Sequence, residues 1–144
     1  MNKGARSLMD FAGVWTITRR IEDRLAGLGR FEGAAQFASD DAGLRYVEDG
    51  VLTLSTGASM RAERAYLWRE GEAGLIDVLF DDGRPFHRFD PNAGGAGERH
   101  YCDPDIYDVV YEVDDWPNWS STWTVTGPRK NYTLRSDYGP ADNV

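Results

Sequence analysis

The chain has 144 residues, which fits one domain spanning residues 1–144 that can bury a core without metal or disulfide staples. Its 24 acidic and 16 basic residues give a formal charge of -8, which argues against nucleic-acid binding, because phosphate contacts require a basic face. A single cysteine, Cys102, rules out an intramolecular disulfide, and no segment reads as a signal peptide or a membrane helix, so we expect a cytoplasmic protein without a membrane span.

Apolar and polar residues alternate along most of the chain, and Gly, Asp and Pro interrupt the alternation every ~8–12 residues, which is typical of an all-β domain. One short helix is expected near the N-terminus, where Ser7 and Asp10 form a capping pair. Gly50 interrupts the third strand and predicts a bulge. In chain order we expect a helix at 2–10 and strands at 14–22 and 30–38, a turn at 40–43 that leads to the strand containing Gly50, and further strands at 60–69, 74–81, 85–90, 98–103, 106–114, 119–126 and 131–138.

About ten strands with short connections predict an antiparallel meander, in which sequence neighbours pair. Closure into a barrel removes the two exposed edge strands of such a sheet. A two-sheet sandwich is the main alternative. Several Trp and Tyr residues fall on one parity of their strands and indicate a wide interior, so we favour a small closed barrel with a short N-terminal helix.

The dipeptide Asp82-Gly83 is the strongest turn signal in the chain and is typical of two-residue hairpin turns. If both residues are central, Val78 lies opposite His87. The more apolar face of this hairpin is expected to point inward and carries Ile76, Val78, Phe80, His87 and Phe89. The opposite face, expected outside, carries Asp77, Leu79, Phe86 and Arg88.

The segment 103–106, Asp-Pro-Asp-Ile, has the composition of a type I turn. It predicts that Cys102 lies opposite Tyr107 and His100 opposite Val109. The inward face of the following strand is expected to hold Tyr107, Val109, Tyr111 and Val113.

The segment 127–130, Gly-Pro-Arg-Lys, predicts a third turn that places Val125 opposite Tyr132 and Trp123 opposite Leu134. This hairpin has the cleanest division between an apolar and a polar face in the chain. We expect inward side chains at Trp119, Ser121, Trp123, Val125, Tyr132, Leu134, Ser136 and Tyr138.

Two independent turns thus send His87, His100 and Cys102 to the inside, beside Tyr107. If both registers hold, His87 pairs near His100 or Cys102, because cross-strand partners share a face. Arg19 alternates with Trp15, Ile17 and Ile21, and Arg64 alternates with Ala62, Tyr66 and Trp68. An inward arginine is a common anchor for a carboxylate or phosphate, although a one-residue bulge would turn either arginine to solvent.

The His87, His100 and Cys102 group has four interpretations. It can line a small-molecule pocket, ligate a metal ion, activate Cys102 as a nucleophile, or form a hydrogen-bonded cluster in a filled core. A lone Cys without a second Cys nearby is a weak zinc signal, so we expect no metal. The pocket and the filled core are the leading interpretations.

Gly13-Val14-Trp15, after a short helix and on the first strand, resembles the G-x-W start of calycins, the lipocalin and fatty-acid-binding-like barrels. The resemblance implies that a basic residue from near the last strand, Arg129, Lys130 or Arg135, lies across Trp15. Haem-binding relatives use a His near the C-terminus, and none follows His100 here, so no cofactor is expected.

The segments 82–87, 100–102 and 127–130 resemble a bacterial family of unknown function with a lipocalin-like barrel. That resemblance implies a fold and no activity. We therefore expect a barrel that binds a small amphipathic or aromatic molecule, with contacts from Arg19, Arg64, His87, His100, Cys102, Tyr107, Tyr111 and Trp123. The alternatives are an enzyme that uses the same His87/His100/Cys102 cluster and a structural or interaction module with a filled core, which would favour a homo-oligomer.

Overall fold

The protein is all-β in a computed structural model that describes residues 6–92 and 99–141. No helix among these residues is long and apolar enough to cross a membrane. Ten strands form one antiparallel sheet, as predicted. The elements are η1 (Leu8–Phe11), β1 (Gly13–Asp23), β2 (Gly27–Asp40), β3 (Gly43–Leu54), β4 (Ser59–Glu70), η2 (Glu72–Gly74), β5 (Ile76–Phe80), β6 (Pro85–Phe89), β7 (His100–Cys102), β8 (Asp105–Glu112), β9 (Trp119–Gly127) and β10 (Lys130–Pro140).

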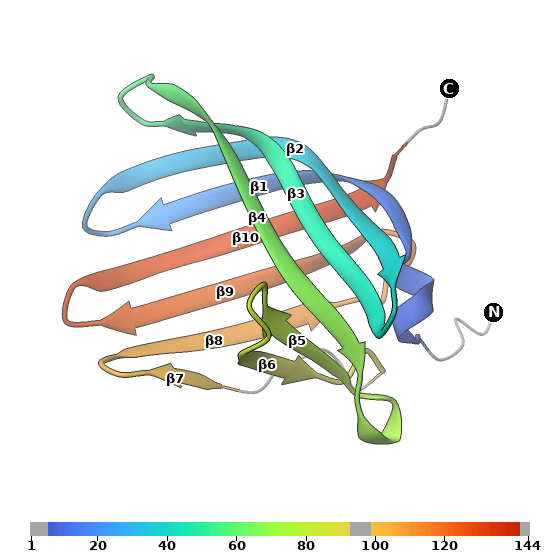
Figure 1. Ribbon diagram of the computed structural model, residues 1–144. Coiled ribbons are helices and arrows are strands. Elements are labelled where there is room, and N and C mark those ends of the chain that lie inside the picture. Colours follow the sequence, from blue (N-terminus) through green and yellow to red (C-terminus); the bar gives the residue numbers. More distant parts are fainter. Residues whose placement is uncertain (1–5, 93–98, 142–144) are drawn as a thin grey trace.

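The sheet curls into a nearly closed barrel (Figure 1). Its strand order is β6-β5-β4-β3-β2-β1-β10-β9-β8-β7, so the meander is closed by pairing of β1 with β10. Within the described residues no ladder joins β6 to β7. The predicted pairing of His87 with the His100 strand is therefore wrong, because these two short strands are the edges of the sheet.

The N-terminal helix is shorter than predicted. It is a single 3₁₀ turn, η1, and residues 2–5 of the predicted helix lie outside the described residues. The Ser7 N–H donates to the Asp10 carboxylate over 2.8 Å, as the capping pair predicts. This turn places Phe11, which is fully buried, at one end of the barrel, and the Trp15 Nε1–H donates to the Phe11 carbonyl over 2.9 Å.

Aromatic rings close this end of the barrel. Phe11 and Trp15 both make edge-to-face contacts with Trp116 and Trp119. Among the described residues, none of the three basic residues expected to lie across Trp15 contacts it. Trp15 pairs with Pro140, whereas Arg129 and Lys130 lie beyond or at the other end of β10, and Arg135 pairs on the exposed surface with Asp137. The strand register thus separates these side chains from Trp15.

The bulge predicted at Gly50 is wrong, because β3 keeps an unbroken register with both β2 and β4. Gly50 instead lies directly opposite Gly33 on β2. A Cβ at Gly50 would lie 2.3 Å from the Glu32 carbonyl oxygen, and one at Gly33 would lie 2.2 Å from the Asp49 carbonyl oxygen. The glycine pair therefore allows two backbones to approach where the sheet curves.

Replacing Gly50 with Ala is expected to lower the free energy of unfolding by about 1–3 kcal/mol, because the added methyl group must displace backbone. Gly29→Ala on β2 is the matched control, since its Cβ would make ordinary 3.5 Å contacts with Ile21 and Thr53. Urea unfolding of both variants measures the difference. Equal losses in the two variants would contradict this account of the glycine pair.

Candidate functional site

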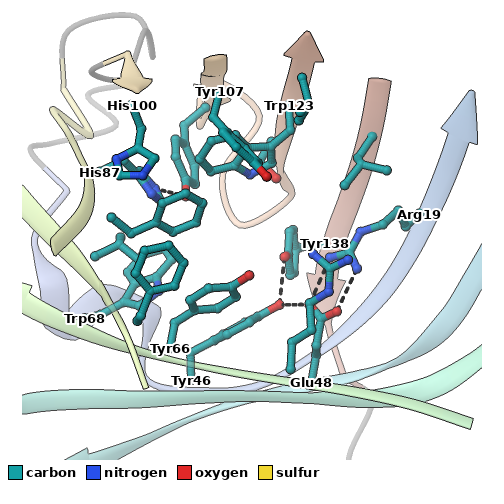
Figure 2. Close-up of a pocket in the computed structure, with 18 of the residues that line it drawn as sticks. Arg19, Tyr46, Glu48, Tyr66, Trp68, His87, His100, Tyr107, Trp123 and Tyr138 are labelled. Carbon is teal, nitrogen blue, oxygen red and sulfur yellow. Dashed lines mark hydrogen bonds and ion pairs between the residues drawn. The ribbon is translucent and has the colours of Figure 1, made fainter. Parts of the chain in front are cut away.

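A cavity of about 270 Å³ occupies the barrel interior, and every strand except β2 contributes to its wall (Figure 2). This cavity is at odds with the alternative of a completely filled core. The structure brings all eight sequence-predicted ligand residues into its lining: Arg19, Arg64, His87, His100, Cys102, Tyr107, Tyr111 and Trp123. That they contact a ligand stays a prediction.

The β9–β10 hairpin supplies one wall, and its predicted register is confirmed. Val125 pairs with Tyr132 and Trp123 pairs with Leu134. All inward side chains predicted for this hairpin line the cavity except Ser136, which is buried behind it and accepts a hydrogen bond from Arg19 Nε over 2.7 Å.

The turn between β7 and β8 differs from its prediction by two residues. His100 pairs with Tyr107 rather than Val109, and Cys102 pairs with Asp105 rather than Tyr107. Asp103 and Pro104 therefore form the turn between the paired residues. Because the shift is two residues, side chains keep their faces, and His100, Cys102 and Tyr107 all line the cavity as expected.

The β5–β6 hairpin has two irregularities that cancel in its register. Its turn has three residues, since the Phe80 N–H donates to the Arg84 carbonyl and the Gly83 N–H donates to the Phe80 carbonyl, both over 2.8 Å. Farther along, Leu79 pairs with Pro85 and Val78 with His87, which leaves Phe86 as an extra residue on β6. The predicted pairing of Val78 with His87 is thus confirmed.

The extra residue reverses the prediction for Phe86. We expected this side chain outside, but the bulge turns it into the cavity beside His87. Its ring stacks on Trp123 at a centroid distance of 4.9 Å and on Phe80 at 4.4 Å. The resulting stack of Phe80, Phe86 and Trp123 forms an aromatic wall from three strands.

A buried ion pair occupies the other side of the cavity (Figure 2). Arg19 Nη1 and Nη2 donate to Glu48 Oε2 and Oε1 over 2.6 and 2.9 Å. The Tyr46 hydroxyl also donates to Glu48 Oε1, and it lies 2.9 Å from the Tyr138 hydroxyl. Glu48 is 1% exposed and Arg19 is 8% exposed, so each buried charge is stabilised by the opposite charge of its partner.

Sequence reasoning found Arg19 but missed Glu48. The signal was present, because Glu48 shares its parity with Leu44 and Tyr46 on β3. The bulge assumed at Gly50 left the facing of this strand open. An unbroken β3 would have indicated an inward carboxylate and a partner for an inward arginine.

His87 is a buried neutral base. Its Nε2 lies 2.8 Å from the Tyr111 hydroxyl, and its Nδ1 has no hydrogen-bond partner among the described residues. Burial among aromatic rings, with a smaller effect from nearby His100, lowers the pKa of His87 to about 3. His87 is therefore uncharged at neutral pH.

Cys102 is exposed at the cavity margin. No hydrogen bond joins it to His87 or His100, and no group of three metal-ligating side chains occurs, in the part of the chain that is described. Catalysis by this cluster stays a prediction that these contacts do not support.

A comparison with protein-family models matches residues 11–140 to a family of unknown function, DUF6314. A comparison with curated proteins gave no match. The family match agrees with the resemblance to a family of unknown function and leaves the calycin resemblance as a prediction. Since the match covers all ten strands, the protein belongs to the DUF6314 family of unknown function.

Proposed function

We propose that the protein binds a small amphipathic or aromatic molecule inside its barrel. The observation that carries this proposal is the internal cavity of about 270 Å³, which is slightly below the ~300–1,000 Å³ typical of ligand pockets. Its lining combines aromatic rings with a few polar groups, the composition that small-molecule sites favour. A ligand of one or two fused rings suits this space.

The polar groups have distinct positions in the lining. The Arg19–Glu48 pair and the Tyr138 hydroxyl lie on one side, and His87, His100, Tyr107 and Trp123 lie on the other (Figure 2). Such separation supports a molecule with an apolar body and polar ends. Native mass spectrometry of the protein purified from its own host is the direct test for a retained ligand.

Replacing Ser121 with Trp is expected to abolish binding of 2-naphthoate and 2-naphthamide, because Ser121 is buried in the cavity lining and an indole there fills the space. Thr122→Trp is the matched control, since the next residue of β9 points to the other face. Titration calorimetry and quenching of the cavity tryptophans report binding. Undiminished binding in the Ser121 variant, or failure of the wild type to bind either probe, would contradict interior binding.

A further inference from the structure

The cavity wall carries one positive charge that the protein does not neutralise. Among the Arg, Lys, Asp and Glu side chains of residues 6–92 and 99–141, three line the cavity: Arg19, Glu48 and Arg64. Burial raises the pKa of Tyr46 and Tyr111, and that of Tyr138 to about 12, so these three hydroxyl groups are neutral at pH 7. One carboxylate therefore faces two guanidinium groups.

The ladder register explains which guanidinium remains unpaired. Glu48 and Arg64 are direct cross-strand partners on β3 and β4, an arrangement that ordinarily favours a salt bridge. Both carboxylate oxygens of Glu48, however, are occupied by Arg19, and one of them also by Tyr46. The Arg64 side chain makes neither a hydrogen bond nor an ion pair with any residue that the structure describes.

Three further carboxylates have partners of their own. Asp81 and Asp82 share a surface depression with Arg64, but they pair with Arg45 and Arg84. Asp105 pairs with Lys130 over 3.0 Å. Arg64 thus lines the cavity as an exposed guanidinium whose five donors are available to an incoming group.

We propose that the ligand is a small aromatic monoanion whose carboxylate binds Arg64 while its ring lies in the cavity toward the Phe86–Trp123 stack. This inference rests on the proposed interior binding and adds a charge and an anchor to it. Arg19, the other candidate anchor from the sequence, has a structural role because its charge is matched by Glu48. A planar carboxylate fits the fork of Arg64 in a bidentate manner.

The test compares 2-naphthoate with 2-naphthamide, which share a ring system and differ in charge. We expect wild-type protein to bind the anion about tenfold more tightly than the amide. Arg64→Gln should lower the affinity for the anion until it equals that for the amide, and Arg64→Lys should retain part of the preference. Because Arg64 is exposed, these variants are expected to fold, which thermal unfolding verifies.

Arg61→Gln is the matched control for the change in net charge. Arg61 lies on the same strand, is exposed, and pairs with Asp49 outside the cavity. Its loss should leave the preference for 2-naphthoate intact.

Equal affinity of the wild type for both probes would overturn the anionic ligand while leaving interior binding in place. A preference that survives in Arg64→Gln would overturn the anchor, and binding of neither probe would overturn both proposals.

Discussion

Glu48→Gln is expected to lower the free energy of unfolding by about 3–5 kcal/mol, the cost typical of breaking a buried ion pair from one side. The substitution keeps the shape of the side chain but leaves Arg19, which is 8% exposed, without a counter-charge. The Gln carbonyl replaces only part of the bidentate contact. Urea unfolding at pH 7 measures the loss.

Glu32→Gln is the control, because Glu32 forms an exposed pair with Arg30 in which both side chains are more than 60% exposed. Its loss should cost less than about 1 kcal/mol. A similar small loss in Glu48→Gln would show that the interior ion pair contributes little beyond its hydrogen bonds.

The cost of Glu48→Gln should also depend on pH. Burial favours the neutral form of Glu48, but the hydrogen bonds and charge of Arg19 outweigh it and hold the pKa of this carboxyl below its ordinary value of 4.5. A depressed carboxyl pKa stabilises the fold above the unfolded value, and this contribution is lost as the pH falls through the folded pKa. The difference between wild type and variant should therefore be largest near pH 7 and shrink below pH 4.5.

His87→Gln is expected to reduce the acid sensitivity of the protein. Burial lowers the pKa of His87 from 6.5 to about 3, so below pH 6.5 the unfolded chain binds a proton that the folded chain does not. Stability then falls with decreasing pH by about 1.4 kcal/mol per unit. Between pH 7.5 and 4.5 the variant should lose about 3 kcal/mol less than wild type, measured by urea unfolding.

His100→Gln provides the comparison, because His100 is only half-buried and is the smaller influence on His87. Most of the acid sensitivity should remain in that variant. If His87→Gln and His100→Gln have the same pH dependence as wild type, acid sensitivity arises elsewhere and His87 is not the neutral buried base described above.

The sequence predicted much of the lining because inward facing depends on parity, and parity survives register errors of two residues. The turn after Cys102 was shifted by two residues, yet His100 and Tyr107 kept their faces. A single extra residue, by contrast, changes which face of the sheet a neighbouring side chain occupies. The bulge on β6 sent Phe86 inward, against its predicted facing, because the inserted residue changes parity locally.

By itself, the sequence determined the all-β meander, the β9–β10 register and most of the inward side chains, since alternation and turn composition are local properties of the chain. Only the tertiary structure decided how those side chains pair across the barrel. Arg19 and Glu48 are 29 residues apart and meet through bidentate bonds inside it, whereas Arg64, directly opposite Glu48 in the ladder, stays unpaired. The Glu48 carboxylate has two oxygens, and both accept hydrogen bonds from Arg19. Which arginine binds them depends on side-chain geometry in the folded barrel, which alternation and turn composition do not predict.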